Sequence, residues 1–593
     1  MSENKKMTLA KQEIVFWKQV LLYVAVVCLT ITVFIKIINI QGFNTEYYSN
    51  LSTDNHKRVI STNCPRGTIF DRNGKELATD LPTFDLYISP TLIKDIDSFT
   101  EILNSCINVD KIKLKKILSE ANSIDESYLI KSNLSDEEIA RFNELSFKLK
   151  GATIKESYKR HYPNGEALAH VLGYTGIASE PELDYYKNLT LDERVGKSGL
   201  EKYYENLLHG EKGRIVQIVS ASGKVLDEME EKPAKKGENI FLTIDLSLQK
   251  KVEEVIGDNY GTGIIIDVKK GELLACASNP SFDPNIFSKD ISDEEWQALN
   301  KKRAFFNIAI QGVYPPGSTF KPLISLYALS KNVINTETKY FCGGSLNVKG
   351  LEEKYKCWVF PSSHGWLNLK DALKYSCDIF FYQLAKDLKI ENFIEFAIKF
   401  GGITKKTGVD LPYENEGFLG SPNWKKKYIG DEWFDGDSMN LGIGQGYILV
   451  TPLQMAKLYL KIANGGKELV PHLLLKTESN KTFNDFYILK EDDYLVEKKY
   501  NDILIDYLKG VTEIGGTAYG LNIDGVKVAA KTGTAEGPNG EHLWLISIYP
   551  AEDPQIVALI MFENSKYQFA SKLTPYMENI LSYYKNEYNT NKR

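Results

Sequence analysis

The sequence lacks a strong basic cluster, a low-complexity tract and an internal repeat. Its formal net charge of −6 at pH 7 gives no electrostatic footprint of nucleic-acid binding, so no nucleic-acid partner is expected. With 43% hydrophobic and 25% charged residues, the composition is that of globular domains, which argues against a disordered or fibrous chain. At 593 residues the chain is too long for a single hydrophobic core, and about three to four domains are expected.

Cysteine is also scarce: seven residues, an odd number, are spread widely over the chain. Small disulfide-stabilised domains have denser cysteines in even numbers, so the sequence does not predict a disulfide framework. Three of the seven nevertheless fall within a 36-residue stretch that also contains a histidine. Four potential ligands so close together make this stretch a candidate metal site.

The sequence has one apolar run long enough to cross a membrane, and it lies near the N-terminus. Residues 20–35 are uncharged and stand between two lysines, and the flanking residues extend the apolar stretch to about twenty residues. Lysines before it favour a cytoplasmic tail over 1–19 and an exported remainder. No small-residue cleavage site follows, so an uncleaved anchor over 20–40 is predicted in preference to a signal peptide. A buried helix of a soluble domain is the third interpretation, against which the N-terminal position argues.

Residues 41–235 mix short strand patterns with turn signals. In "RGTIFDRNGKELATD" two strands are predicted to meet at Asn73-Gly74, a strong hairpin signal. Residues 91–150 are charged with a helical period, which predicts an inserted helical lobe. "GLEKYYENLLHGEKG" predicts an amphipathic helix ended by glycine, and the polar joint "KPAKKGENI" predicts a domain boundary near residue 235.

The remaining residues, 236–593, predict one large α+β domain. It begins with a strand and a helix in "NIFLTIDLSLQKKVEEVI" and a hairpin in "GTGIIIDVKKGELLACAS". A largely helical stretch follows over roughly 318–465. Three strand-like runs, the first containing "KTGTAEG", and a C-terminal helix close the chain.

The stretch "YPPGSTFKP" places Ser318 three residues before Lys321. Serine is a poor nucleophile without an adjacent base, and residues three apart on a helix share a face, so the lysine can serve as that base. The preceding Pro-Pro-Gly favours a helix start, where free N–H groups can polarise a carbonyl. Three other S-x-x-K matches occur in the chain, and a helix-capping serine with a solvated lysine explains an isolated match as well.

Two further motifs follow in the order used by serine–lysine acyl-transfer enzymes. "YSCDIF" provides Ser376 and Asp378 as an S-x-D motif, and "KTGTAEG" provides Lys531-Thr532-Gly533 at the end of a strand-like run. An edge strand that lines a cleft is the context that this last motif needs. A second K-T-G match at 406–408 follows a Gly-Gly break and leads into a proline, so it is predicted to be a loop.

With these motifs the chain resembles the class B penicillin-binding proteins, which are peptidoglycan D,D-transpeptidases. The resemblance covers nearly the whole chain, through "RGTIFDRNG", "RHYPNGEALAHVLGY", "GKSGLEKYYENLLHG", "ASNPSFDPN" and "GIGQGYILVTPLQ". Asp378, where division-specific members usually have asparagine, and the cysteine-bearing loop before it indicate the elongation-specific group, penicillin-binding protein 2. The resemblance implies a transmembrane helix, an elongated pedestal (dimerisation-type) domain over 41–235 with a head lobe near 91–150, and a serine β-lactamase-like transpeptidase domain over 236–593.

The resemblance also implies a catalytic site of eight residues: Ser318, Lys321, Ser376, Asp378, Lys531, Thr532, Gly533 and Thr534. Ser318 is expected to attack the penultimate D-Ala carbonyl of a stem pentapeptide with Lys321 as base, while the N–H groups of Ser318 and Thr534 form the oxyanion hole. Ser376 is expected to relay a proton to the leaving amine, oriented within a network of Lys321 and Asp378. Lys531 and the two threonine hydroxyls are expected to hold the terminal carboxylate. β-Lactams are expected to acylate Ser318, and the chemistry needs no cofactor.

A bacterial inner-membrane protein with a single span and a periplasmic catalytic domain is implied as well. Its expected partners are the SEDS-family glycosyltransferase RodA and the morphogenesis protein MreC. A division-specific transpeptidase, or a scaffold that mainly activates a SEDS glycosyltransferase, remain alternatives. The long pedestal and the retained anchor argue against a D,D-carboxypeptidase or a β-lactamase.

Cys342, Cys357, His364 and Cys377 offer the four nitrogen and sulfur ligands that a structural zinc requires. Their spacing is looser than that of a zinc finger, and a Cys342–Cys357 disulfide or buried thiols with a surface histidine fit it too. By the resemblance zinc is expected, because penicillin-binding protein 2 homologues hold zinc near the active site at similarly placed residues, some of them aspartates. Since Cys377 lies inside the S-x-D motif, a metal there would brace this loop and take no part in the chemistry.

Overall fold

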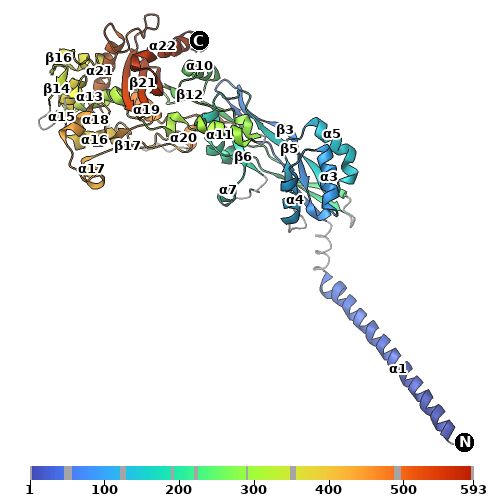
Figure 1. Cartoon of the computed structure of the whole chain (residues 1–593). Coiled ribbons are helices and arrows are strands. Elements are labelled where there is room, and N and C mark those ends of the chain that lie inside the picture. Colours follow the sequence, from blue (N-terminus) through green and yellow to red (C-terminus); the bar gives the residue numbers. More distant parts are fainter. Residues whose placement is uncertain are drawn as a thin grey trace. The chain divides into compact units, whose positions relative to one another are not determined.

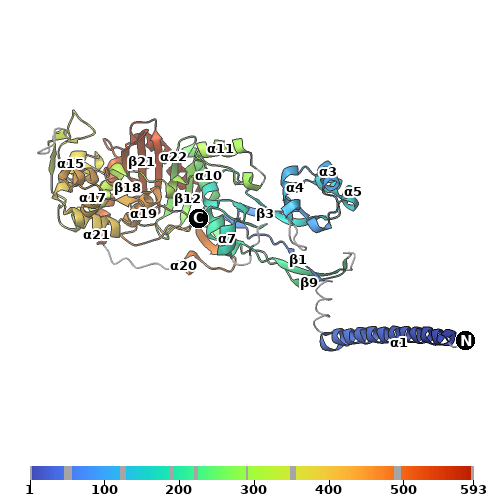
Figure 2. The same ribbon diagram turned by 60° about the horizontal axis from the view of Figure 1, so that its bottom comes forward.

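The computed structural model describes residues 3–45, 57–120, 128–186, 189, 193–219, 225–288, 291–347, 355–486 and 496–588 (Figures 1 and 2). It confirms a mixed α+β protein with an apolar N-terminal helix. Contacts divide the chain into two compact units, one of residues 1–64 with 211–235 and one of residues 65–210 with 236–593. Each unit therefore combines segments that are far apart in the sequence.

The first unit contains the N-terminal helix and a small antiparallel sheet. Helix α1, Glu3–Ile38, continues into a short π-helix, Asn39–Phe43. The segment Phe16–Phe43 has a mean hydropathy of 2.6 and no buried residue, so it is long and apolar enough to cross a membrane, and the predicted anchor lies within it. The sheet has the order β1-β8-β9, with strands Lys57–Thr62, Gly213–Val219 and Val225–Lys232.

The second unit contains a six-stranded sheet in which early and late parts of the chain meet. Its order is β19-β10-β2-β3-β4, and β5 pairs with β3. The predicted hairpin is confirmed, because β2 and β3 are joined at Asn73-Gly74, where Gly74 has φ +83°, a conformation that glycine adopts without strain. The strands are Ile69–Phe70 (β2), Glu76–Ile88 (β3), Tyr128–Lys131 (β4), Ala152–His161 (β5), Ile240–Leu242 (β10) and Leu474–Thr477 (β19).

The predicted helical lobe near 91–150 is present and has a hydrophobic core of its own, which includes Phe99 and Phe142. Asp95 and Ser135 accept hydrogen bonds from backbone N–H groups at the starts of its first and third helices. The helical period does not predict β4, which lies in this segment because its backbone pairs with the long strand β3. The helices are α3 (Ile96–Cys106), α4 (Lys111–Glu120) and α5 (Asp136–Leu145).

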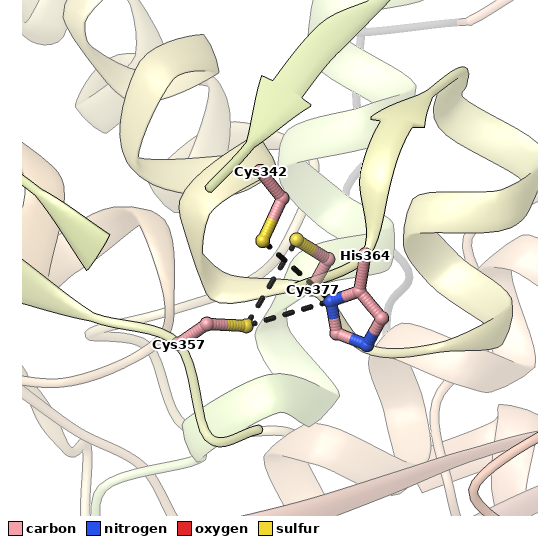
Figure 3. Close-up of side chains that lie close together, drawn as sticks. All are labelled: Cys342, Cys357, His364 and Cys377. Atoms are coloured by element: carbon pink, nitrogen blue, oxygen red, sulfur yellow. Dashed lines mark hydrogen bonds between the residues drawn. The ribbon is translucent and has the colours of Figure 1, made fainter. Parts of the chain in front are cut away.

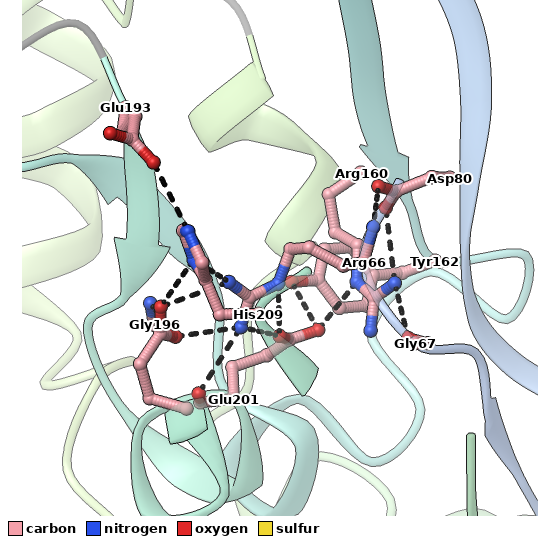
Figure 4. Close-up of polar contacts among 10 residues, drawn as sticks. Arg66, Gly67, Asp80, Arg160, Tyr162, Glu193, Gly196, Glu201 and His209 are labelled. Atoms are coloured by element: carbon pink, nitrogen blue, oxygen red, sulfur yellow. Dashed lines mark hydrogen bonds and ion pairs between the residues drawn. The ribbon is translucent and has the colours of Figure 1, made fainter. Parts of the chain in front are cut away.

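A buried ionic network joins the sequence motifs of this part of the chain (Figure 4). Arg66 Nη2 lies 2.9 Å from Glu201 Oε2 and 2.7 Å from Glu205 Oε2. Arg160 lies on the other side of Glu201, with Nε 2.6 Å from its Oε1. Buried charges are costly unless they are paired, so the arginine of "RGTIFDRNG" and the glutamates of "GLEKYYENLLHG" fix each other's positions.

The helix predicted over "GLEKYYENLLHG" is divided into α8, Gly199–Tyr203, and α9, Glu205–Leu208. Tyr204 lies between them with a non-helical ψ of 26°, and its hydroxyl donates to Asp410 Oδ2 at 2.7 Å. Local periodicity cannot predict this break, because the partner of Tyr204 lies about two hundred residues further along the chain.

A five-stranded antiparallel sheet forms the centre of the C-terminal part, in the order β12-β11-β22-β21-β20. Helices α10 and α22 pack together against it, and α19 packs against its central strands (Figure 1). The K-T-G strand β20 is an edge strand, as predicted, and the predicted hairpin, strand runs and C-terminal helix are confirmed. The elements are β11 (Gly261–Asp267), β12 (Leu273–Asn279), β20 (Ala529–Gly537), β21 (Gly540–Tyr549), β22 (Ile556–Ser565), α10 (Leu246–Ile256) and α22 (Thr574–Tyr583).

The helical stretch between the hairpin and the last three strands is interrupted by several short strands. Four of them lie in residues 340–347 and 355–367, which we call the cysteine lobe. These strands are β13 (Tyr340–Cys342), β14 (Ser345–Leu346), β15 (Tyr355–Lys356) and β16 (Gly365–Leu367). The helices are α13 (Lys321–Ser330), α14 (Leu369–Lys374), α15 (Asp378–Asp387), α16 (Ile390–Lys399), α17 (Pro422–Tyr428), α18 (Asp435–Gly442) and α19 (Pro452–Ala463).

Candidate active site

The first motif forms a tight turn at the start of a helix. Gly317–Phe320 is a 3-10 helix that leads into α13, so Ser318 lies just before the α-helix and Lys321 begins it. Gly317 has φ +53°, and a Cβ atom there would lie 2.7 Å from the backbone oxygen of Thr534. A glycine is therefore required where this nucleophile turn approaches the K-T-G strand.

Lys321 is completely buried, and its ammonium group is bonded to the S-x-D motif. Nζ donates to Asp378 Oδ1 at 2.8 Å and to Ser376 O at 2.9 Å, and it lies 3.4 Å from Ser376 Oγ. Among the described residues, Nζ forms no hydrogen bond with Ser318 Oγ, so the expected direct contact between nucleophile and base is not made in this conformation. The carboxylate instead neutralises the buried charge.

Ser376 adopts a strained backbone conformation between two helices. It follows α14 and precedes α15, and its φ of +52° lies in the left-handed region, which costs a residue other than glycine about 1–3 kcal/mol. This conformation brings its carbonyl to Lys321 and its hydroxyl to Lys531. Backbone strain of this kind is concentrated at functional sites.

Lys531 extends from the edge strand β20 into the same cluster. Its Nζ lies 2.9 Å from Ser376 Oγ and 3.0 Å from Thr532 O, and its side chain is completely buried. Burial lowers the pKa of Lys531 well below its usual value, and the charge of Lys321 lowers it further. The carboxylate of Asp378 is bonded to Lys321, and among the described residues Lys531 forms no such ion pair.

Gly533 lets the K-T-G strand pack against the nucleophile turn. A Cβ atom on Gly533 would lie 2.8 Å from Thr319 Cγ2 and 2.9 Å from Pro316 O. The other K-T-G match, 406–408, is a loop away from this cluster, as predicted, and Thr407 Oγ1 donates to Glu414 Oε1 at 2.5 Å. The fold thus distinguishes the K-T-G match that lies in the cluster from the one that lies in a loop, which the motif alone does not do.

The two threonines of the K-T-G-T stretch have partners outside the predicted motifs. Thr532 Oγ1 lies 2.6 Å from Thr517 Oγ1, and Thr534 Oγ1 accepts from the N–H of Ala570 at 3.3 Å. The sequence motifs did not indicate Thr517, although its position in "GGTAYG", a turn signal shortly before the strand, marks a loop that could return to it. A second missed residue, Trp358, contacts Asp378.

The side chains of Cys342, Cys357, His364 and Cys377 point toward one another (Figure 3). Their sulfur and nitrogen ligand atoms all lie within 4.8 Å of one another. His364 Nδ1 is 3.7 Å from Cys342 Sγ and 3.6 Å from Cys357 Sγ, and the sulfurs of Cys357 and Cys377 are 4.0 Å apart. A tetrahedral zinc with metal–ligand bonds of about 2.0–2.3 Å needs ligand separations of roughly 3.5–3.8 Å. The three separations given above, 3.6–4.0 Å, are close to this range, so the side chains could hold this ion after small shifts. All seven cysteines are free, so the Cys342–Cys357 disulfide is not formed.

The same contacts favour a thiolate at this cluster. The pKa of the Cys357 thiol is lowered by the hydrogen bond from Cys377, and further by His364. Backbone N–H groups, including that of Val359, add to this effect. The pKa of Cys377 is raised, because its proton is held in the bond to Cys357 and because the thiol is buried. Thiolates are the form in which cysteine binds metal ions.

The chain matches two known domain families and proteins that contain both. Residues 261–582 match the penicillin binding protein transpeptidase domain, and residues 61–242 match the penicillin-binding protein dimerisation domain. The peptidoglycan D,D-transpeptidase MrdA of Salmonella typhimurium (strain SL1344) is 35% identical over 469 residues, which cover 77% of this chain and 75% of that protein.

Solved structures are similar over almost the whole chain. PBP2 in a complex with MreC from Helicobacter pylori has a TM-score of 0.79 and 29% sequence identity, covering 90% of this chain and 99% of that chain. A protein of a peptidoglycan synthase complex that coordinates polymerization and crosslinking has a TM-score of 0.69 and 26% identity, covering 95% of this chain and 97% of that chain.

The hydrogen-bonded cluster of Lys321, Ser376 and Lys531 lies inside the matched transpeptidase domain, which alone accounts for more than half of the chain. The dimerisation domain matches the segment that contains the pedestal motifs. The chain therefore belongs to the class B penicillin-binding proteins, with PBP2 among its structural relatives, and is a serine-type peptidoglycan D,D-transpeptidase.

Proposed function

We propose that the chain cross-links peptidoglycan stem peptides during elongation of the lateral wall, with Ser318 as the nucleophile. The observation that carries the proposal is the convergence of three distant motifs on one cluster. Ser376 lies between Lys321 and Lys531, at 2.9 Å from each through its carbonyl and its hydroxyl, next to the turn that carries Ser318.

In the first half-reaction, Ser318 Oγ attacks the carbonyl carbon of the penultimate D-Ala and gives its proton to Lys321. The N–H groups of Ser318 and Thr534 stabilise the negative charge that develops on the carbonyl oxygen. The C–N bond then breaks, Ser376 passes a proton to the leaving amine, and the terminal D-Ala departs. An ester between the shortened stem and Ser318 remains.

Lys321 must be neutral to act as the base, although its ammonium is paired with Asp378. Ser376 Oγ lies between the two lysines, 3.4 Å from Lys321 Nζ and 2.9 Å from Lys531 Nζ. A substrate carboxylate next to Lys531 favours the ammonium form of that lysine. Substrate binding therefore draws a proton from Lys321 through the Ser376 hydroxyl and prepares the base.

The terminal carboxylate of the stem is held by Lys531 and by the hydroxyls of Thr532 and Thr534, which positions the carbonyl for attack. Thr517 orients the Thr532 hydroxyl. In the second half-reaction an amine of a neighbouring stem attacks the ester and loses a proton to the lysine base, and Ser318 leaves as its hydroxyl. The new amide is the cross-link. A β-lactam forms the same ester with Ser318 but has no leaving group that departs.

The predicted layout of the chain is part of this proposal. A cytoplasmic tail over 1–19 and an anchor over 20–40 precede a pedestal over 41–235, with its head lobe at 91–150, and the transpeptidase domain over 236–593. The apolar helix and the lysines before it support a single span with the catalytic domain in the periplasm.

The proposed partners are MreC and the SEDS-family glycosyltransferase RodA. A structurally similar PBP2 is solved as a complex with MreC, and another similar chain belongs to a synthase complex that coordinates polymerization and crosslinking. A chain that cross-links new glycan needs a polymerase beside it, which favours a membrane complex of the two activities.

The cysteine cluster is proposed to hold a structural zinc through Cys342, Cys357, His364 and Cys377, whose spacing supports this ion. Zinc held by these four residues would have no open position for substrate, so it would supply rigidity to the loop that contains Ser376. The reaction itself proceeds with the side chains described above.

The test is cross-linking by the full-length protein in vesicles that contain polymerised glycan with pentapeptide stems. Wild-type protein should release D-Ala and form dimeric muropeptides, and Ser318→Ala should do neither. Dimer formation by the variant would refute the assignment of the nucleophile. In cells, depletion should give round cells, whereas filaments would place the enzyme in division.

A further inference from the structure

We propose that Trp358, in the cysteine lobe, is a positioning residue that holds the S-x-D loop at two points. This inference rests on the proposed catalytic role of that loop. The backbone N–H of Trp358 donates to Asp378 Oδ2 at 3.0 Å, and its indole Nε1–H donates to Tyr375 O at 3.0 Å. The two acceptors lie on either side of Ser376 in the chain, so Trp358 forms hydrogen bonds on both sides of this serine.

The backbone hydrogen bond acts on the carboxylate that pairs with Lys321. Oδ1 of Asp378 accepts from Lys321 Nζ at 2.8 Å, while Oδ2 accepts from Trp358. A carboxylate with a donor on each oxygen cannot turn about its bond to Cβ without losing both contacts. The N–H of Trp358 therefore fixes the direction in which Asp378 meets the buried lysine.

The indole hydrogen bond acts on the strained turn. Tyr375 is the C-cap residue of helix α14, and its carbonyl precedes Ser376, which has φ +52°. Carbonyls at helix ends have no partner within the helix, and the indole N–H of Trp358 provides one here. The Tyr375 ring also stacks on the ring of His364, with centroids 5.6 Å apart and planes 12° apart. Both contacts restrain the segment that places the Ser376 hydroxyl between the lysines.

The position of Trp358 connects the cysteine cluster with the reaction centre. It directly follows Cys357 and is the second residue of a turn in which the N–H of Phe360 donates to Cys357 O at 2.9 Å. Its side chain is 53% exposed, so core packing does not account for a tryptophan at this position. Trp358 therefore links the cysteine cluster directly to Asp378, and a rigid cluster restrains the position of that carboxylate.

Four variants of the full-length protein separate the two bonds. Trp358→Phe removes the indole N–H and keeps a ring. Trp358→Ala keeps the backbone N–H, whereas Trp358→Pro removes it. Proline is favoured at the second position of a β-turn, so the Ala–Pro comparison isolates the N–H. Trp366→Ala removes another tryptophan of the same lobe, 68% exposed, and is the control.

The measurement is the rate of acylation by penicillin as a function of its concentration, which separates the limiting rate constant from the half-saturating concentration. We expect the limiting rate constant of Trp358→Pro to be roughly ten- to hundredfold lower than that of Trp358→Ala. This difference corresponds to the loss of one hydrogen bond to a charged group. Trp358→Phe should lose about three- to tenfold, the range of a neutral hydrogen bond. Half-saturation in every variant, and both constants in Trp366→Ala, should stay within about twofold of wild type.

Equal limiting constants for Trp358→Ala and Trp358→Pro would overturn the role of the backbone N–H. The melting temperature and the number of thiols that react with a thiol reagent are measured on the same samples. Slow acylation with an unchanged melting temperature and an unchanged number of reactive thiols supports the positioning role of Trp358. Slow acylation with a lower melting temperature and newly reactive thiols contradicts that role. A wild-type protein that forms no adduct on Ser318 would refute the proposed function instead, so the two failures are distinct.

Discussion

Lys531 Nζ lies 2.9 Å from Ser376 Oγ, and both residues are buried. This contact joins the K-T-G motif to the S-x-D motif, and Lys321 joins the S-x-D motif to the nucleophile turn. The three motifs therefore form one hydrogen-bonded cluster, in which protons can move between lysines without bulk water.

Replacement of Lys531 by methionine is expected to stabilise the fold while it strongly slows acylation. The pKa of Lys531 is lowered in the folded protein, so the unfolded chain binds the proton more tightly and folding is opposed below the usual lysine pKa. Methionine has a similar volume and no ionisable group, so it removes this unfavourable contribution to folding. The melting temperature at pH 7 should rise, and the gain should shrink as the pH is raised toward about 10, where the unfolded lysine also becomes neutral.

The control for this variant is Lys531→Arg, which keeps a charge and should give no stabilisation. Acylation by penicillin should fall roughly hundredfold or more in the methionine variant, because the carboxylate of the ligand loses its cation. A methionine variant that melts at a lower temperature than wild type would contradict the lowered pKa.

Gly533→Ala should impair acylation without unfolding the protein. The added Cβ atom would lie 2.8 Å from Thr319 Cγ2, so β20 and the nucleophile turn must separate by several tenths of an ångström. Misplacement on this scale is expected to slow acylation by roughly tenfold to a hundredfold. Penicillin-binding kinetics and the melting temperature check this. Gly510→Ala is the control, because its added Cβ atom would meet only the Lys374 side chain, at 3.6 Å or more. Normal kinetics of Gly533→Ala would show that the close approach is not needed.

Zinc should be present at one ion per chain in protein purified without chelators. A strong chelator should lower the melting temperature and slow acylation, and added zinc should restore both, because metal binding stabilises the fold that presents the ligands. Cys342→Ser should lower the zinc content in metal analysis. Cys64→Ser, outside the cluster, should leave it unchanged. Zinc-free protein with normal stability and normal acylation would exclude the ion from this site.

The ionic network of the pedestal segment should make stability depend on pH. Burial opposes a charge on His209, yet its hydrogen bonds to Glu193 and Glu205 raise its pKa to about 8. The folded protein therefore holds this proton more tightly than the unfolded chain. The resulting stability, about 2 kcal/mol, is present below pH 6.5 and is lost as the pH rises through about 8.

The measurement is unfolding by denaturant in a series of buffers from pH 6 to pH 9, compared with His209→Gln. The wild-type protein should lose stability over this range, and the variant should change less, because its side chain has no proton to lose. Glu205 remains paired with Arg66 in both proteins. Parallel curves for the two proteins would contradict the role of His209.

Much of the fold follows from local patterns. The hairpin at Asn73-Gly74, the alternation of strand and helix after residue 240, and the apolar N-terminal helix all depend on short-range signals, and each is confirmed. Long-range contacts decide the rest. The break at Tyr204 is tied to Asp410, and β4 depends on pairing with β3, so neither can be found from the period of its own segment.

The motifs identify the residues of the hydrogen-bonded cluster but not their full arrangement. The motifs identify the two lysines and Ser376, and the network of Lys321 with Asp378 that the resemblance implies is present. The reach of Lys321 to the Ser318 hydroxyl, which helix spacing predicts, is not made among the described residues. The lowered pKa of Lys531 depends on its burial and on the nearby charge of Lys321, and neither property is encoded in motif spacing. Trp358 has no motif at all, since its role arises from a turn of the cysteine lobe.

The most direct test of the account is the intact mass of the purified protein after reaction with penicillin, with and without an excess of mecillinam. By its resemblance to the elongation enzymes, the chain should react preferentially with mecillinam. We expect one stable adduct per chain, mapped to Ser318 by peptide analysis, absent in Ser318→Ala and blocked by mecillinam. Folded wild-type protein without an adduct, or with an adduct on another residue, would contradict the assignment of the nucleophile, and an adduct that mecillinam leaves intact would contradict the elongation role.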